Sequence, residues 1–302
     1  MKILINRKLV DGPWGGGNLF VKAFIKEMSS LKHHIIHNLE ADIDCVFIQD
    51  PRYDELGISI NEIINYKRNY KPNICIVQRI NECDARKGTQ DVDDILRECS
   101  NYLDHTFFVS DWMKDYHIQR GWNCKSNSTL LNGVDEFFVP RAKIKNGKIN
   151  IVTHHWSNNY MKGFDIYDKI DEEVGKRNDI TFTYIGRERG SFKNTRVIEP
   201  LYGEVLANEL GKYDVYVSAS KFDPGPNHVL EALACQIPTY AHVNGGGTVE
   251  FVGKNHTYSD WNDLLNIINK NSFMLNDFKT RSWQCCILDL ERKLNEITLF
   301  KY

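Results

Sequence analysis

Two carboxylates eight positions apart, Asp223 and Glu231, give this sequence its clearest indication of chemistry. The apolar alternating run 215–217 before them indicates a buried strand, and a helical pattern runs from His228 to Cys235. Asp223 would lie in the turn-rich loop between the strand and the helix, and Glu231 in the first turns of the helix. Both carboxylates can then face one cleft, where they would hold hydroxyl groups of a ligand.

The loop between the two acids also offers a place for a phosphate. Gly225 would let a ligand approach the backbone closely. The N–H groups at the start of the helix form an anion site, which Pro226 and Asn227 would help to shape. A nucleotide-activated sugar carries both hydroxyl groups, which the two carboxylates could bind, and phosphates, which the start of the helix could bind. The alternative is an ordinary strand-turn-helix unit with solvated acids.

This stretch resembles the acidic-pair motif of the family-4 retaining glycosyltransferases, which have the GT-B fold. In that family an acidic residue, seven others and a Glu lead into a helix that reads roughly Glu-Ala-Leu-Ala-Cys/Gly-Gly-x-Pro. The helix here reads Glu-Ala-Leu-Ala-Cys-Gln-Ile-Pro over 231–238. Two residues depart from the pattern, because Asp223 replaces the usual Glu and Gln236 the usual Gly. The resemblance extends over nearly the whole chain and is strongest over 149–252.

The resemblance implies roles for residues of the second half. Lys162 belongs to a matching Lys-Gly pair whose lysine meets the donor diphosphate, so catalysis is expected from Asp223, Glu231 and Lys162. The arginine that usually accompanies this lysine is missing, and His155 stands in its region. Its charge is then lost or comes from Arg187 or Arg79, and a purely structural role for His154 and His155 stays open. Donor contacts are expected from Gly186, Arg187, Pro200, Leu201, Gly225, Pro226, Asn227 and His155. Contacts to the donor or the acceptor are expected from Gly246, Gly247 and Glu250, which match another sequence motif of the family, Gly-Gly, two residues and Glu.

A glycine-rich loop over 11–18 follows the first predicted strand, 2–6, and precedes an amphipathic helix, 19–28. This order opens a Rossmann-like domain. It is neither a dinucleotide fingerprint, since Phe20 occupies the place of the last glycine, nor a P-loop, since no Gly-Lys-Ser/Thr follows. We therefore expect Gly15, Gly16 and Gly17 to let the donor or the acceptor approach the backbone, a flexible turn being the alternative.

A polar cluster follows the strong predicted strand 73–77. Ligands in α/β sheets bind beyond the carboxyl ends of strands, so Arg79, Asn81 and Asp84 are candidates for contacts to the sugar or the acceptor. A salt-bridged loop is the alternative. The histidine that the family often has in this region is missing.

A metal site is not expected. Asp42 and Asp44 form a D-x-D triplet, which binds a divalent ion in a different glycosyltransferase fold. Here the triplet immediately precedes a predicted strand, so a polar turn is favoured. His154 and His155 lack a third ligand at a spacing suited to zinc.

The chain has 302 residues, which favours two domains. We expect an N-terminal Rossmann-like acceptor domain over 1–140, a nucleotide-sugar domain over 141–275, and a final segment, 276–302, whose helix packs back on the first domain. The net charge of −2 does not indicate nucleic-acid binding. The sequence lacks a signal peptide and a membrane-spanning run, so a cytoplasmic protein is expected.

The resemblance thus implies an α/β protein with two Rossmann-like domains facing each other across a cleft. It implies a glycosyltransferase that moves a sugar from a nucleoside diphosphate sugar, UDP- or GDP-linked, to a hydroxyl of a glycan or small molecule. Retention at the anomeric carbon and independence of metals and cofactors are expected from the same resemblance. The alternatives are a GT-B nucleotide-sugar epimerase and a non-catalytic nucleotide-sugar-binding protein.

Overall fold

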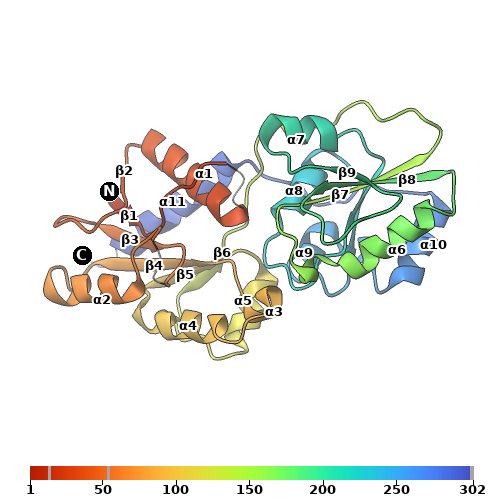
Figure 1. The fold of residues 1–302 in the computed structure, drawn as a ribbon. Helices are drawn as coiled ribbons and strands as arrows, with labels where there is room; N and C mark the ends of the chain where they lie inside the picture. The colour runs from red at the N-terminus through yellow and green to blue at the C-terminus, as the bar shows by residue number, and fades with distance from the viewer. Residues whose placement is uncertain (13–14, 53–54, 300–302) are drawn as a thin grey trace. The chain divides into compact units, whose positions relative to one another are not determined.

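The computed structural model describes residues 1–12, 15–52 and 55–299, so Pro13 and Trp14 of the predicted glycine loop lie outside the described residues. The chain divides into two compact units (Figure 1). The first unit comprises Met1–Ala85, Thr89–Asn132 and the residues from Trp283 onward. The second comprises Arg86–Gly88 and Gly133–Ser282. The divisions at 132/133 and 282/283 lie a few residues from the expected boundaries at 140/141 and 275/276. The roles expected for the two units stay predictions.

The first unit is built on a six-stranded parallel sheet with the strand order β2-β1-β3-β4-β5-β6. Its strands are β1 (Lys2–Ile5), β2 (His34–Ile36), β3 (Cys45–Ile48), β4 (Cys75–Ile80), β5 (His105–Phe108) and β6 (Asn127–Thr129). Its helices are α1 (Gly16–Ser30), α2 (Ile60–Asn69), α4 (Val92–Cys99), the 3-10 turn η1 (Ser100–Tyr102), α5 (Asp111–Ile118) and α11 (Trp283–Leu299). The short helix α3 (Asp84–Lys87) contains a change from the first unit to the second.

The core of the first unit lies mainly between the sheet and the pair α1 and α11 (Figure 1). Phe20 and Phe24 of α1 pack on Phe47 of β3, with ring centroids 5.6 and 4.9 Å apart. Trp283 and Leu290 of α11 belong to the same buried cluster. Helix α2 covers the opposite face. The C-terminal helix is therefore part of the first unit's core.

The second unit has a six-stranded parallel sheet with the order β12-β11-β10-β7-β8-β9. Its strands are β7 (Ile149–His155), β8 (Ile180–Gly186), β9 (Arg196–Ile198), β10 (Val215–Ser218), β11 (Thr239–His242) and β12 (Thr257–Tyr258). Its helices are η2 (Tyr160–Lys162), α6 (Phe164–Val174), α7 (Gly203–Leu210), α8 (Asn227–Ala234), α9 (Thr248–Val252), η3 (Lys254–His256) and α10 (Trp261–Lys270). Helices α6 and α10 cover one face of the sheet and bury an apolar cluster there (Figure 1).

Three elements differ from the sequence predictions in ways that affect the site. Strand β4 continues to Ile80, so Arg79 lies inside a strand and not in the loop that was expected to follow 73–77. Helix α1 begins at Gly16 instead of position 19, because Gly15 at φ 83° serves as its N-cap. Helix α11 begins at Trp283, later than 276. Among the described residues, every helix is too short or too polar to cross a membrane.

Candidate functional site

The carboxyl ends of β7 and β10 form the centre of the candidate site in the second unit. The two strands are neighbours in the sheet, but the chain proceeds from β7 to β8 and β9 on one side and then returns to β10 on the other. This reversal is a topological switch point, where open α/β sheets bind their ligands. The predicted acids Asp223 and Glu231 follow β10, and His154 and His155 end β7.

Asp223 is held by a buried lysine. Lys162 Nζ lies 3.0 Å from Asp223 Oδ2, and the two side chains are only 11% and 9% exposed. Gly163, at φ 88°, follows the lysine, and a Cβ on it would lie 2.1 Å from the Ala219 carbonyl oxygen. Only glycine fits there, so the turn that carries Lys162 sits directly on the end of β10. The predicted acid and the predicted lysine therefore meet.

The backbone of Asp223 is held by the predicted glycine motif that follows β11. Its N–H donates to the Gly245 carbonyl over 3.0 Å, and its carbonyl accepts from the N–H of Gly247 over 2.9 Å. Between them Gly246 adopts φ 69°, and a Cβ there would lie 2.9 Å from the Asp223 carbonyl oxygen. Gly246 and Gly247 thus orient the aspartate, whereas Glu250 is exposed on α9.

The ion pair stays charged at neutral pH. Burial alone would raise the pKa of Asp223, but Lys162 and then Arg86 outweigh it and hold that pKa well below its usual range. Burial, together with Arg86, lowers the pKa of Lys162 to about 8, against the pull of Asp223. Arg86 Nε is 3.6 Å from Asp223 Oδ2. The carboxylate therefore has two cationic neighbours.

Glu231 pairs with a histidine. His154 Nε2 lies 2.7 Å from Glu231 Oε2, and the side chains are 9% and 12% exposed. The last residues of β7 and the first turns of α8 position the two groups. The sequence pointed to the glutamate, but its pairing with His154 was not predicted.

Two further histidines lie behind these acids. His155 Nε2 is 2.7 Å from the hydroxyl of Tyr167, and His228 Nε2 is 3.1 Å from Ser218 Oγ. The rings of His155 and His228 have centroids 4.7 Å apart. Burial, followed by the neighbouring positive charges, holds the pKa of both histidines well below its usual value. Both rings are therefore neutral at pH 7.

The start of α8 has the features expected of an anion site. Pro226 is its N-cap residue and has no side-chain acceptor for the first N–H groups. Its carbonyl accepts from the N–H of Val229 over 3.1 Å. The helix begins with Asn227 and His228, next to Asp223 in the chain. A helix start of this kind favours a phosphate or a carboxylate.

The remaining donor-binding predictions divide into two groups. Gly186 and Arg187 lie beside His155, since a Cβ on Gly186 would be 1.9 Å from the His155 carbonyl oxygen and the Arg187 N–H donates to that oxygen over 3.3 Å. The Arg187 guanidinium lies 3.8 Å from the centre of the Trp156 ring. Pro200 and Leu201 are half-buried, and no described side chain of the cluster contacts them through a hydrogen bond or an ion pair.

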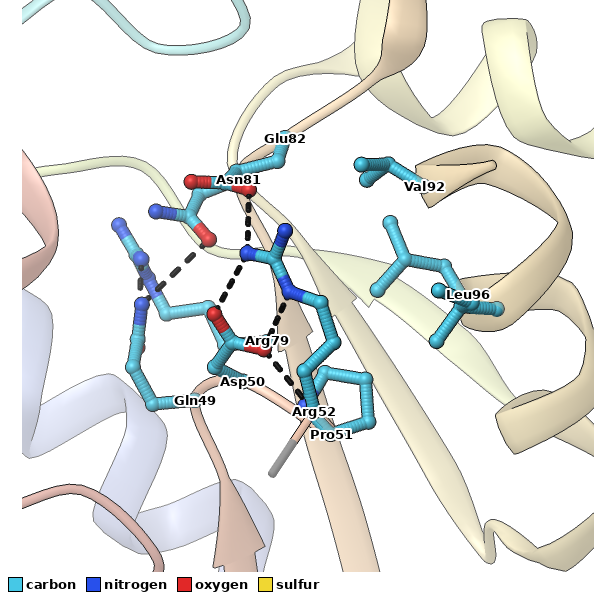
Figure 2. Close-up of a pocket in the computed structure, with 10 residues that line it drawn as sticks. Gln49, Asp50, Pro51, Arg52, Arg79, Asn81, Glu82, Val92 and Leu96 are labelled. Atoms are coloured by element: carbon cyan, nitrogen blue, oxygen red, sulfur yellow. Dashed lines mark hydrogen bonds and ion pairs between the residues drawn. The ribbon is translucent and has the colours of Figure 1, made fainter. Parts of the chain in front are cut away.

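A second candidate site lies in the first unit, at the carboxyl ends of β3 and β4. Figure 2 shows the side chains that line a pocket there. Arg52 binds Asp50 through two hydrogen bonds of 2.9 and 2.7 Å and reaches Glu82 over 2.9 Å. Apolar side chains of α4 form the other wall. The lining residues are Gln49, Asp50, Pro51, Arg52, Arg79, Asn81, Glu82, Val92, Ile95 and Leu96.

The glycine-rich start of α1 borders the amides of this pocket. Gln49 Nε2 donates to Asn81 Oδ1 over 3.4 Å. A Cβ on Gly17 would lie 3.4 Å from Gln49 Nε2 and 3.5 Å from Asn81 Nδ2. Gly15 and Gly16 precede it, as N-cap and first residue of the helix. The predicted glycines and Asn81 are therefore together.

Two other predicted contacts of this region are occupied by the fold. Arg79 is buried in β4, where it donates to Asn132 and Gln49 and lies 4.2 Å from the centre of the Phe20 ring. Burial lowers its pKa to about 9. The Asp84 carboxylate accepts from the N–H groups of Val92 and Asp93 over 3.0 and 3.1 Å, so it caps α4. Their proposed contacts to a ligand would have to compete with these interactions.

The D-x-D triplet lies immediately before β3, at the amino end of that strand. Asp42 Oδ1 lies 2.6 Å from Lys2 Nζ, and Asp44 Oδ2 accepts from the Lys2 N–H over 2.7 Å. Ile43 between them is buried. These contacts agree with a polar turn. Among residues 1–12, 15–52 and 55–299, no three His, Cys, Asp or Glu side chains gather in a group that could hold a metal ion.

Comparisons with solved structures agree with this architecture. The chain is similar to Anabaena HepE in complex with UDP and glucose, at 13% identity and a TM-score of 0.70 over 98% of this chain and 99% of that chain. It is similar to sucrose-phosphate synthase from Thermosynechococcus elongatus, at 12% identity and 0.70 over 98% of each chain. It is also similar to the lipopolysaccharide outer core galactosyltransferase WaaB, at 14% identity and 0.67 over 100% of each.

The chain is less similar to known proteins in sequence than in fold. No protein-family model matches the chain, and no curated protein is similar enough in sequence to count as a match. At 12–14% identity, the three solved structures inform the fold alone. With two parallel six-stranded sheets and near-complete coverage of these glycosyltransferases, the chain has the GT-B fold that its motifs predicted.

Proposed function

We propose that this protein is a glycosyltransferase that moves a sugar from a nucleoside diphosphate sugar to a hydroxyl group of an acceptor. The observation that carries the proposal is the pair Asp223 and Glu231 at the β7–β10 switch point. The side chains of the two acids are 9% and 12% exposed, and each is held by a basic partner, Lys162 or His154, at 3.0 or 2.7 Å. The GT-B fold supports the same activity.

The acids suit the recognition of hydroxyl groups. A buried carboxylate with one fixed partner keeps other lone pairs for hydroxyl donors, and charge-assisted hydrogen bonds of this kind are strong. We assign Asp223 to hydroxyls of the transferred sugar and Glu231 to the ribose or the sugar. The diphosphate is assigned to Lys162 and to the start of α8, where Gly225, Pro226 and Asn227 lie.

The reaction breaks the bond between the anomeric carbon and a diphosphate oxygen, and the electron pair leaves with the diphosphate. The acceptor oxygen forms a new bond to the anomeric carbon on the face that the diphosphate leaves, and the acceptor proton passes to the departing diphosphate. Lys162 would offset the charge that develops on the leaving group. This front-face course gives retention. We infer retention and metal independence from the resemblance to family-4 enzymes.

UDP-linked sugars are the first donors to test. Solved structures of HepE, which has the same fold, contain UDP and UDP-glucose. The acceptor would use the pocket of the first unit, whose amides and acids suit hydroxyl groups and whose α4 wall suits the apolar face of a sugar ring. A cytoplasmic location stays a prediction.

A thermal-shift screen with UDP, GDP, ADP and their sugars tests the donor class, because a ligand that binds the folded state raises the unfolding temperature. We expect one base to stabilise the protein. Incubation of that donor with mixed sugar acceptors, followed by product analysis, then tests transfer. Turnover of the donor into an isomer without any acceptor would indicate an epimerase instead, and binding without turnover would indicate a non-catalytic protein.

Metal independence has its own test. Transfer should proceed unchanged after treatment with EDTA, since we assign charge neutralisation at the diphosphate to Lys162. Complete loss of activity in EDTA, restored by manganese, would contradict this and would return attention to Asp42 and Asp44.

A further inference from the structure

Charged side chains already pair with one another at the proposed donor site before a donor arrives. Lys162 and Arg86 are cations close to Asp223, and the carboxylate of Glu231 lies 2.7 Å from His154. A diphosphate adds negative charge to this shielded region, where uncompensated charge is costly. A neutral group that takes up a proton there would offset part of this charge when a donor binds.

His155 and His228 are the groups placed to do so. Their rings meet edge to face with centroids 4.7 Å apart, and His155 is 3% and His228 8% exposed. The Nδ1 atom of His155 is buried without a hydrogen-bond partner among the described residues. His228 is the second residue of α8, at the helix end that suits a phosphate. Lys162, the residue assigned to the diphosphate, is a positive neighbour that lowers the pKa of both rings.

The groups facing these rings explain why they are neutral without ligand. His155 faces Tyr167 of α6 and Tyr184 of β8, and His228 faces His154 of β7 and Tyr216 of β10. Lys162 and Arg86 repel a proton on either ring. Asp223 attracts a proton to His228 but is itself matched by Lys162. The balance of burial and positive neighbours thus favours the uncharged form. A diphosphate that binds nearby adds negative charge and so opposes the effect of these positive neighbours.

We propose that His155 and His228 are donor-binding residues which take up a proton when the diphosphate of a sugar nucleotide binds. The positive charge then exists only in the complex. The proposal rests on the proposed function, because it needs a nucleoside diphosphate sugar at this site. An opposite charge within about 4–6 Å raises the pKa of a base by about 1–3, which moves the pKa of a buried histidine back toward the neutral range.

The sign of the pH dependence follows. The free protein binds fewer protons at these rings than the complex does between their free and bound pKa values. Donor affinity should therefore fall as the pH rises through that interval, by at most about tenfold per pH unit for each proton. Binding should be tighter at pH 6 than at pH 8.

Titration calorimetry in buffers of different ionisation enthalpy measures the uptake directly. The probe is UDP-glucose, or GDP-mannose or ADP-glucose if the screen favours that base, because a diphosphate diester lacks the phosphate proton that titrates near pH 6 in a monoester. We expect uptake of up to about one proton per ring at pH 6.5 in the unmodified protein. The corresponding nucleoside, which has no diphosphate, should bind without uptake.

Two variants assign the proton. His155→Gln and His228→Gln keep a hydrogen-bonding amide but cannot titrate, so each should reduce the uptake and flatten the pH dependence of the dissociation constant. His34→Gln, on the exposed edge strand β2, is the matched control and should change neither. Circular dichroism checks that each variant is folded.

The possible outcomes separate the two proposals. Donor binding without proton uptake, or uptake that survives in both glutamine variants, would overturn this inference and leave the glycosyltransferase proposal standing. If no sugar nucleotide binds, the proposed function fails and this inference fails with it.

Discussion

The charged side chains at the carboxyl ends of the strands differ between the two units in how far they are exposed to water. In the second unit, Asp223 and Glu231 are each buried and fixed by a buried partner. In the first unit, Asp50 and Glu82 share Arg52, whose side chain is 38% exposed. Charges shielded from water interact strongly and cost little to reorient during a reaction. This difference suits the proposed division of roles, with the chemistry in the second unit and exchangeable contacts to acceptor hydroxyl groups in the first.

The largest effect is expected from removing an acid of the second unit. Glu231→Ala removes a charged hydrogen-bond acceptor from a shielded site, so kcat/KM for transfer should fall by about 10²–10³, as when one preorganised polar group is removed from an active site. The variant should remain folded, which circular dichroism and thermal unfolding check. Glu204→Ala, an exposed acid on α7, is the control and should keep full activity. Full activity of Glu231→Ala would remove the basis for the assignment.

Much of the second site could be predicted because its residues are close in the sequence or belong to one motif. Asp223 and Glu231 lie on one strand-turn-helix unit, and Gly246 and Gly247 follow the next strand. Lys162 was chosen through the family resemblance, but its ion pair with Asp223 was not predicted. The pairing of His154 with Glu231 was not predicted, because it depends on β7 lying beside β10, and these strands are about sixty residues apart in the chain.

The pocket of the first unit was predicted only in part. Asn81 and the glycines of α1 were expected at a ligand, and they do lie together. Arg52 and Asp50 gave no local signal, since their role comes from the parallel pairing of β3 with β4. Arg79 and Asp84 were chosen as polar residues after a strand, but one is buried in that strand and the other caps α4. Spacing alone does not separate a ligand contact from a capping contact.

The second largest effect is expected from replacing His154, the partner of Glu231. His154→Gln would leave Glu231 with a neutral amide in place of the imidazole and loosen its orientation. We expect a loss of about tenfold in kcat/KM, or about 1.4 kcal/mol of transition-state stabilisation. The loss should appear mainly in the KM for the donor if Glu231 binds ribose. A change confined to the unfolding temperature, with unchanged kinetics, would mean that His154 is only structural.

A smaller effect is expected in the first unit. Asn81→Ala removes one amide from the pocket, so the KM for the acceptor should rise several-fold, as expected for a neutral hydrogen bond worth about 1 kcal/mol. Affinity for the donor should stay unchanged, which calorimetry measures. Asn101→Ala, an exposed asparagine of the same unit, serves as the control. An equal loss of donor affinity would contradict the separation of the two sites.

The smallest effect is on stability and concerns the buried histidines. Their pKa values are lower in the folded protein than the value of about 6.5 in an unfolded chain, so the unfolded state binds more protons as the pH falls below that value. Without donor, the unfolding temperature should therefore decrease from pH 7 to pH 5, by about 2–4 °C for each kcal/mol lost.

The double variant His155→Gln/His228→Gln should show a weaker decrease over the same range. Part of the decrease will remain, because other histidines with lowered pKa values act in the same direction: His105, His117 and His242. A sugar nucleotide at saturation should also oppose the decrease. An unfolding temperature that falls as steeply in the double variant as in the unmodified protein would assign the effect to those other residues.

The position of α11 has a consequence for how the protein is made. Trp283, Ile287, Leu290 and Leu294 complete the apolar core of the first unit, although they follow the whole of the second unit in the chain. During synthesis the ribosome releases residues 133–282 before this helix emerges. The second unit can then fold while the first still exposes the face that α1 shares with α11, so the domain begun first is finished last.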